Sequence, residues 1–465
     1  MFSRRQFIGS SAAATAVCLA GCSGKKEEIS SDIDVTALLE DPERLKKGLM
    51  ENARDVFSKN RVDSSIGLFH LPSSVTYRSF FAWDSGWHIV ALAHVDPEAA
   101  YKELETVFTV QTPEGRVPHQ VRVPELKPET IERKLTLYLL RRQFDDMGRT
   151  RFIDPPSFLI AAQVLFEKTG DERVLALLPK MEKCVDYLTG PRDLFGDGLV
   201  SIIHPWESGT DSAPVFDAPL GIENVGSPGA VLKYATTYPE LLNFAAKKDF
   251  DLEELARANR FVFEDVGMNS VTCAGIVAIS ELYRLAGYPE KSKEYMSRAK
   301  AMAAAIETIM WDEKAGFFYP RYDIEKPKLS RRRCLTGLTP LITGLVSEDK
   351  AGRVLDENLL SPAHFYGPWL VPFNSISELE ENIPMENTLL WRGHCIWANM
   401  NWMAARAADN YGRPDVAREI TRSTASMVAR SGFFEFYHTR TGKGGGAPLF
   451  TWPALVIDMI ERYGI

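Results

Sequence analysis

The sequence has few cysteines, and none of them is placed for a metal site. Six occur in 465 residues. Cys184, Cys273, Cys334 and Cys395 lie far apart on apolar segments. No pair forms the CxxC spacing that many zinc sites use. We therefore expect no metal ion and no other cofactor. We interpret these four residues as buried free thiols, with one disulfide as the open alternative.

An excess of basic residues is also lacking. Lys and Arg total 54 against 62 Asp and Glu, which gives a net charge of −8. Nucleic-acid binding generally uses a basic surface, so we expect no nucleic-acid partner. The short basic run at residues 330–333 (SRRR) is interpreted as a solvated loop.

The apolar run at residues 8–20 is rich in Ala and Ser and is too short to cross a bilayer, which takes about 20 apolar residues. It follows a twin-arginine pattern at residues 3–8 (SRRQFI). It ends in a sequence that resembles a bacterial lipobox, residues 19–22 (LAGC). These features predict twin-arginine export, with Cys22 as the acylated residue.

The N-terminal features divide the chain into three parts. We expect a lipoprotein signal peptide over residues 1–21, a polar tether over residues 22–34 and a catalytic domain over residues 35–465. The expected location is periplasmic or at the cell surface, with a lipid anchor in a bacterial membrane. An ordinary cleaved signal with a coincidental cysteine is the alternative.

Strand-like alternation is sparse, and it is confined to short pieces such as residues 199–203 and 316–319. The dominant period is helical. Four times, an apolar helix ends at Gly or Asp and an amphipathic helix follows. The apolar stretches are residues 87–94, 158–168, 273–286 and 388–411.

A helix that is apolar on all sides must be buried, and a helix with one polar side can cover it. Nested pairs of this kind predict an all-α (α/α) toroid, in which the functional loops gather at one end of the inner ring. Long loops in a compact domain are usually functional. The Pro-rich segments 320–340 and 361–384 are therefore candidates for pocket walls, and residues 121–150 for a cap on the ring.

Two distant stretches each set a carboxylate among aromatic and small residues. They are residues 205–211 (PWESGTD) and 432–437 (GFFEFY). A carboxylate beside aromatic rings is partly desolvated, so its pKa can be moved into the range of a catalytic acid or base. The first stretch holds two candidate catalytic carboxyls, Glu207 and Asp211, and the second holds one, Glu435.

The chain has nine tryptophans. Each one alone is most simply explained by core packing. Four of them, Trp83, Trp206, Trp391 and Trp452, stand next to small or charged residues near expected helix ends. Indole faces stack on the apolar faces of sugars, and neighbouring polar groups bind hydroxyls. The cluster predicts a pocket for a small saccharide.

Two further patterns have simple interpretations. His88 and His94 are six residues apart and do not share a helix face, so we expect no metal there. His119 is expected to bond a sugar hydroxyl. Residues 444–446 (GGG) lack the Lys-Ser/Thr that completes a phosphate-binding loop. They predict a mobile loop near the pocket mouth.

Six motifs, taken in order, resemble glycoside hydrolase family 63. They are residues 83–85 (WDS), 115–119 (GRVPH), 154–156 (DPP), 204–214 (HPWESGTDSAP), 391–393 (WRG) and 433–437 (FFEFY). The resemblance covers residues 78–465 and is greatest to the short bacterial members of the mannosylglycerate hydrolase type. Trehalases are more distant relatives. Each motif alone is weak, whereas six in order are specific.

The resemblance implies an (α/α)6 barrel that hydrolyses α-glycosides with inversion. It places Asp211 at the general acid and Glu435 at the general base. Glu207, the rival for either role, follows Trp206 directly and matches no catalytic position in the family, so we interpret it as a hydroxyl-binding or orienting residue. The resemblance also implies a sugar subsite, and the full set of expected substrate-binding residues is Trp83, Asp84, Arg116, His119, Trp206, Glu207, Trp391, Arg392, Tyr437 and Trp452.

Three positions depart from the family's usual pattern. Asp154 stands where Gln is common, Ser212-Ala213 where Asn-Ser is common, and Leu390 where Tyr is common. None of these departures removes a candidate catalytic carboxylate. They bear on which substrate is recognised.

We therefore expect an inverting, exo-acting α-glycosidase for small α-glycosides or oligosaccharide ends. Burial beside Trp206 and the negative charge of Glu207 are expected to raise the pKa of Asp211. An attacking water requires the two carboxyls to be about 6.5–9.5 Å apart. The alternatives are a uronate lyase on the same toroid, using Tyr437 and His119, and a catalytically inactive saccharide-binding lipoprotein.

Overall fold

The structure is a computed structural model that describes residues 41–126, 140–222, 228–381 and 390–465. The expected signal peptide, the acylated Cys22 and the tether lie outside these ranges and stay predictions. Much of the basic stretch in the expected cap at 121–150 lies outside them as well.

The first helix pair shows how the sequence sets an inner and an outer layer. Helix α4 (Ala82–Val95) is buried without interruption from Ala82 to Ala93, whereas α5 (Pro97–Thr109) buries one face only. Asp96 separates them, and its side chain accepts the N–H of Ala99 at 3.1 Å. Pro97 then starts α5 with the fixed φ that the first turn of a helix requires.

The other elements repeat this alternation. The inner ones are α7 (Ser157–Thr169), α11 (Val266–Leu285), the 3-10 helix η5 (Leu335–Thr343), α15 (Ala398–Asn410), and η7 (Trp452–Leu455) with α17 (Val456–Tyr463). The outer ones are α3 (Pro42–Asn60), α8 (Leu178–Thr189), α12 (Pro289–Ile309), α13 (Glu348–Arg353) with η6 (Val354–Leu359), and α16 (Pro414–Ser431).

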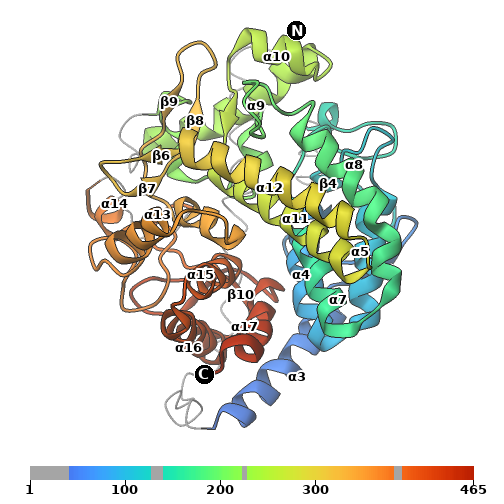
Figure 1. The fold of residues 1–465 in the computed structure, drawn as a ribbon, viewed down its shortest axis with the longest axis vertical. Helices are drawn as coiled ribbons and strands as arrows, with labels where there is room; N and C mark the ends of the chain where they lie inside the picture. The colour runs from blue at the N-terminus through green and yellow to red at the C-terminus, as the bar shows by residue number, and fades with distance from the viewer. Residues whose placement is uncertain (1–40, 127–139, 223–227, 382–389) are drawn as a thin grey trace.

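The inner elements form a closed ring. Going round it, α4 contacts α7, α7 contacts α11, α11 contacts η5, η5 contacts α15, α15 contacts η7, and η7 contacts α4. The N-terminal helix α3 contacts α4, α16 and α17, so the two ends of the described chain lie side by side (Figure 1). The predicted (α/α)6 barrel is confirmed.

Helix α11 is the one described helix that is long and apolar enough to cross a membrane. In this fold 83% of that stretch is buried inside the protein. Its place in the inner ring accounts for its composition, because an inner helix meets other helices on every side.

The remaining helices are short or lie in the connections. They are η1 (Arg141–Gln143), η2 (Glu172–Leu177), η3 (Pro205–Ser208), η4 (Pro214–Phe216), α9 (Pro228–Lys247), α10 (Leu252–Ala258) and α14 (Ile376–Glu381). Figure 1 shows α10 and the hairpin of β8 (Arg321–Tyr322) and β9 (Lys328–Leu329) projecting from one edge of the molecule.

The strands are short and antiparallel. They are β1 (Arg61–Ser64), β2 (Gly67–His70), β3 (Phe80–Phe81), β4 (Gln120–Val121), β5 (Phe263–Glu264), β6 (Trp311–Asp312), β7 (Phe317–Phe318), β8 (Arg321–Tyr322), β9 (Lys328–Leu329), β10 (Phe434–Tyr437) and β11 (Gly444–Pro448). The strand predicted over residues 316–319 corresponds to β7. The one predicted over residues 199–203 contributes only a single bridge, from Ile202 to Phe263.

Two predictions about local structure are wrong. Residues 444–446 are part of β11, which pairs with β10, and do not form a loop. The fourth predicted apolar helix, α15, begins at Ala398 rather than 388. Leu390 and Gly393 have φ angles of 51° and 89°, which a helix does not allow. The four cysteines that were predicted to be buried free thiols are buried and free.

Candidate active site

One cavity of about 220 Å³ lies at the N-terminal ends of the inner helices. It is small for a ligand site, since drug-sized molecules typically occupy about 300–1,000 Å³. Its walls come from eight separate parts of the chain. They are formed by Pro72, Tyr77, Phe81, Trp83, Asp84, His119, Gln120, Leu140, Gln143, Asp154, Trp206, Gly209, Asp211, Leu390, Trp391, Trp397, Glu435, Phe450 and Trp452.

Asp211 enters the cavity from the loop after η3. Gly209 makes the turn possible, because its φ is 70° and an added Cβ would lie 2.9 Å from the indole of Trp83. The hydroxyl of Tyr238 donates to the backbone carbonyl of Asp211 and holds the loop. Burial raises the pKa of the Asp211 carboxyl to about 6, with His119 opposing the shift and Asp154 adding to it.

The predicted cause of the raised pKa of Asp211 is therefore wrong in part. Burial contributes as predicted, but the negative charge that adds to it belongs to Asp154 rather than Glu207. Glu207 is neutralised by a partner, described below. Asp211 can thus hold a proton in mildly acidic solution, which is the state that a general acid requires.

Glu435 enters the cavity from β10 and is only 5% exposed. One carboxylate oxygen accepts the hydroxyl of Tyr77, and the other accepts the N–H of Ala447 at 2.8 Å. Burial raises the pKa of the Glu435 carboxyl, these two donors oppose the rise, and Asp211 adds to it. Hydrogen bonds to both oxygens favour the ionised form, which a general base requires.

A third carboxyl, Asp84, lies in the first turn of α4. Burial, followed by the charge of Asp154, raises its pKa well above the usual range. A carboxyl that stays protonated can donate a hydrogen bond to a ligand oxygen. Asp84 is therefore suited to binding a hydroxyl, and its role in substrate binding stays a prediction.

Asp154 and His119 form an ion pair in the wall. Nδ1 of His119 lies 2.8 Å from one oxygen of Asp154, and the other oxygen accepts the backbone N–H of Trp83 at 3.1 Å. Burial opposes a charge on His119, but Asp154 and the hydrogen bond raise the pKa of the imidazole. The departure from Gln at position 154 thus supplies a partner for this histidine.

Aromatic rings form much of the cavity wall. Trp391 stacks on Trp397 with ring centroids 3.8 Å apart and an angle of 11° between the planes. Trp452 contacts both of them, and Trp83 meets Trp452 edge-on at 6.5 Å. Such surfaces can stack on a sugar ring. The predicted residues Trp83, Trp206, Trp391 and Trp452 all line the cavity.

Four predicted substrate-binding residues do not line the cavity, and two of them are buried in ion pairs. Glu207 pairs with Arg192 at 2.7 Å and also accepts the backbone N–H groups of Ile153 and Ile203. Arg392 pairs with Asp217 at 2.6 Å. Both groups point into the protein, because neighbours in an extended or 3-10 backbone face different directions.

The other two, Arg116 and Tyr437, bond to backbone carbonyls. The guanidinium of Arg116 donates to Thr150, and burial lowers its pKa. The hydroxyl of Tyr437 donates to the carbonyl of Gly432 at 2.7 Å. Because the Tyr437 hydroxyl makes this bond and lies away from the cavity, Tyr437 does not fit the role of catalytic base in the alternative lyase mechanism.

The cavity also contains residues that sequence reasoning did not select. Tyr77, Gln120, Gln143 and Trp397 line it, together with Pro72, Phe81, Leu140 and Phe450. Tyr77 stands just before the first family-like motif, which is the one signal that could have drawn attention to it. The described parts of segments 320–340 and 361–384 contribute none of the lining residues, so their prediction as pocket walls is wrong.

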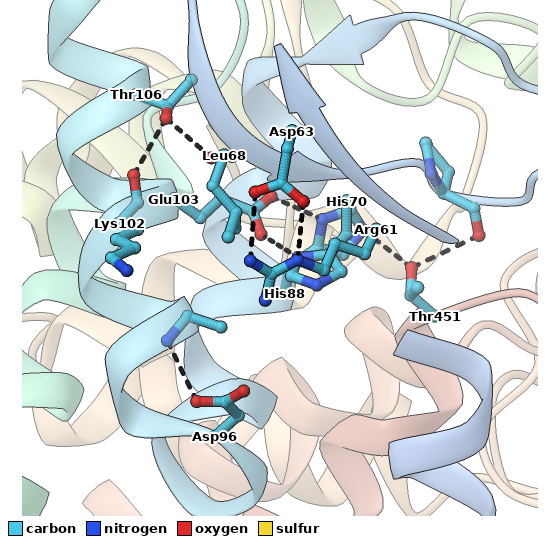
Figure 2. Close-up of polar contacts among 12 residues, drawn as sticks. Arg61, Asp63, Leu68, His70, His88, Asp96, Lys102, Glu103, Thr106 and Thr451 are labelled. Carbon is cyan, nitrogen blue, oxygen red and sulfur yellow. Dashed lines mark hydrogen bonds and ion pairs between the residues drawn. The ribbon is translucent and has the colours of Figure 1, made fainter. Parts of the chain in front are cut away.

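No group of three or more His, Cys, Asp or Glu side chains within the described ranges has an arrangement that could hold a metal ion. His88 is bonded to Glu103 and Thr451 (Figure 2), and His94 to Asp458. These partners account for both histidines as parts of the protein interior.

Comparison with known proteins agrees with this architecture. The family described as the mannosylglycerate hydrolase MGH1-like glycoside hydrolase domain matches residues 77–453. A mannosylglycerate hydrolase of Thermus thermophilus is 28% identical over 425 residues, which are 84% of this chain and 96% of that protein. A periplasmic trehalase of Salmonella agona is 23% identical over 84% of this chain and 67% of its own length.

Solved structures give the same result. The GH63 mannosylglycerate hydrolase from another strain of Thermus thermophilus, in complex with Tris and D-glycerate, is 25% identical with a TM-score of 0.74. The match covers 89% of this chain and 100% of that one. The neutral trehalase of Saccharomyces cerevisiae shares the fold, with a TM-score of 0.56 over 85% of this chain and 73% of its own. The chain belongs to the mannosylglycerate hydrolase MGH1-like glycoside hydrolases of family 63.

Proposed function

We propose that this glycoside hydrolase is an inverting, exo-acting α-glycosidase, with Asp211 as general acid and Glu435 as general base. The observation that carries the proposal is that these two carboxyls, from distant parts of the chain, line one small cavity walled by indoles. Asp84 and Asp154 also line it, but Asp154 is paired with His119, and the raised pKa of Asp84 suits a hydrogen-bond donor.

The proposed reaction is a single displacement. Asp211 gives its proton to the glycosidic oxygen as the bond from that oxygen to the anomeric carbon breaks. Glu435 takes a proton from a water molecule, which attacks the anomeric carbon from the opposite face. The products are a sugar of inverted anomeric configuration and a free alcohol. Asp211 ends ionised and Glu435 protonated, so one proton exchange restores the enzyme.

The cavity favours a single sugar ring at the end of its substrate. Its volume of about 220 Å³ is small, and packed aromatic rings form much of its wall. We propose small α-glycosides or oligosaccharide ends as substrates. Glycosylglycerates and trehalose belong in a first panel, because relatives carry the names mannosylglycerate hydrolase and trehalase.

The experiment is a panel of α-linked disaccharides and glycosylglycerates followed by proton NMR from the first minutes of reaction. The proposal expects the β anomer of the released sugar to appear before mutarotation. Early appearance of the α anomer would contradict inversion. An unsaturated, ultraviolet-absorbing product would indicate a lyase instead. Binding of the panel compounds without turnover would indicate an inactive saccharide-binding protein.

Export as a lipoprotein is a separate proposal, supported by the twin-arginine pattern and the lipobox-like residues 19–22. Acylated Cys22 would anchor the protein in a bacterial membrane. Metabolic labelling with a tritiated fatty acid in a bacterium with a twin-arginine system tests it. Label is expected in the natural chain and not in Cys22→Ala. Equal labelling of both chains would reject the anchor.

A further inference from the structure

A buried network of two histidines and one carboxylate lies behind the cavity wall. His70 ends β2, His88 is in α4 and Glu103 is in α5, and all three side chains are buried. Figure 2 shows both rings directed toward Glu103. Its carboxylate lies 2.7 Å from Nδ1 of His70 and 2.8 Å from Nδ1 of His88. Phe57 of α3 packs edge-on against both imidazoles.

The network determines which nitrogen of His88 carries a proton. Burial alone would raise the pKa of Glu103, but the two imidazoles and their hydrogen bonds lower it to about 2. The carboxylate is therefore ionised and can only accept, so the proton of His88 is on Nδ1. Burial lowers the pKa of His88, which keeps the imidazole neutral. Its other nitrogen, Nε2, is then an acceptor.

That acceptor holds Thr451. The Thr451 hydroxyl lies 2.7 Å from Nε2 of His88 and 3.4 Å from the carbonyl of Pro72, so its single proton goes to the closer acceptor, Nε2. The backbone N–H of Thr451 donates to the same Pro72 carbonyl at 3.0 Å. Thr451 is 1% exposed and stands between Phe450 and Trp452. Both of these rings line the cavity, as does Pro72. A single residue behind the wall is thus connected to three residues in it.

A displacement of Thr451 would reach the other aromatic rings of the cavity wall through Trp452. Its ring lies near four others of the wall. The centroid distances are 5.1 Å to Phe450, 5.6 Å to Trp397, 6.1 Å to Trp391 and 6.5 Å to Trp83. Because close-packed rings cannot shift independently, the position of Thr451 affects the whole aromatic wall.

We propose that His88 and Thr451 are positioning residues of the cavity. The imidazole of His88, oriented by Glu103, holds the Thr451 hydroxyl and thereby places Phe450 and Trp452 where the sugar binds. Neither His88 nor Thr451 lines the cavity. The expected effect on turnover rests on the proposed function, whereas the expected effect on the aromatic wall does not.

The test removes the hydroxyl while keeping the size of the side chain, in Thr451→Val. Its matched control is Thr421→Val, because Thr421 is also buried and its hydroxyl donates within α16, to the carbonyl of Ala417 at 2.8 Å. We expect Thr451→Val to lower kcat/KM by about 10- to 100-fold, since small misplacements around a site have effects of this size. We also expect it to weaken the near-ultraviolet circular dichroism of the indoles.

Far-ultraviolet circular dichroism should stay unchanged in all variants. Thr451→Ser keeps the hydroxyl, so it should retain most of the kcat/KM and most of the near-ultraviolet signal that Thr451→Val loses. Thr421→Val should show neither loss. A Thr451→Val protein with the near-ultraviolet spectrum of Thr421→Val would overturn the proposal. This comparison holds even if the natural chain hydrolyses no glycoside, so failure of the proposed function is distinguishable from failure of this inference.

Nitrogen-15 NMR of labelled histidines tests the orienting step directly. The signal that disappears in His88→Gln identifies His88. The proposal expects a neutral ring protonated on Nδ1. A ring protonated on Nε2 would overturn it, because Nε2 could not then accept the Thr451 hydroxyl.

Discussion

At the scale of single residues, the environment gives three aspartates of one cavity three different states. Asp211 has a pKa raised to about 6, mainly by burial. Burial also raises the pKa of Asp84 well above its usual range. Asp154 is paired with His119 at 2.8 Å. One side-chain type can therefore supply a proton donor for the reaction, a donor for a hydroxyl and a partner for a histidine.

Tyr77 is predicted to set the acidic limb of the pH profile. Its hydroxyl donates to Glu435 and opposes the rise in the pKa of that carboxyl. Tyr77→Phe removes this donor, so the pKa of Glu435 should rise. Because the base acts when ionised, activity at low pH should be lost sooner. The measurement is kcat/KM against pH, in which the acidic limb should move to higher pH. A limb that stays in place or moves down would contradict the assignment.

Gly446 is predicted to be required for the position of Glu435. An added Cβ would lie 2.4 Å from the Glu435 carboxylate, at a φ of 74°. Gly412 is the matched control, since its φ is 71° and nothing lies within 4 Å of an added Cβ. Both Gly→Ala changes strain the backbone by about 1–2 kcal/mol. Only Gly446→Ala should also lower kcat, by about 10²-fold. Equal kcat in the two variants would contradict this role.

The sequence predicts most of the site but not which member of each motif faces the cavity. Trp391 and Trp206 line it, whereas their neighbours Arg392 and Glu207 turn into the protein. Adjacent residues on an irregular backbone point in different directions, and the sequence carries no period there to tell them apart. Tyr77 was missed because its role depends on Glu435, 358 positions away.

At the scale of elements, the helix pairs were predictable because local signals mark them. Asp96 caps α5, and Gly170 closes α7 with a φ of 65°. The start of α15 was not predictable in this way. Residues 390–397 directly precede the apolar residues of α15 in the sequence but form an irregular segment that brings Trp391 and Trp397 to the cavity. Here tertiary contacts override the local preference.

The loop that carries Asp211 is anchored by a buried ion pair. Glu207 is fully buried, pairs with Arg192 at 2.7 Å and accepts two backbone N–H groups. Glu207→Ala should therefore lower the free energy of unfolding by about 3–5 kcal/mol, because it leaves Arg192 buried without its partner. The measurement is urea unfolding followed by circular dichroism.

The matched variant is the double change Arg192→Met with Glu207→Leu, which removes both charges. It should recover much of the lost stability, since two apolar side chains can replace a buried pair. A double variant as unstable as Glu207→Ala would contradict the ion-pair explanation. A Glu207→Ala protein of natural stability that had lost only substrate affinity would restore Glu207 as a binding residue.

At the scale of the whole molecule, closing the ring assembles the site. The first and last parts of the described chain meet where α3 packs against α16 and α17 (Figure 1). At this junction Asn60 donates to the carbonyl of Leu449 at 2.7 Å, and Tyr77 bonds Glu435. The proposed base is therefore held by the N-terminal part of the chain, and Asp211 comes from the middle of it. Neither the N-terminal half nor the C-terminal half of the chain contains both carboxyls.

The most direct measurement of the central claim is turnover by Asp211→Asn and Glu435→Gln on the best substrate of the panel, with circular dichroism to confirm the fold. Both changes keep the size of the side chain and remove its ability to exchange a proton. General acid and base catalysis each contribute about 10²–10⁴-fold, so each variant should lose at least that much kcat. Either variant with the kcat of the natural chain would contradict the account.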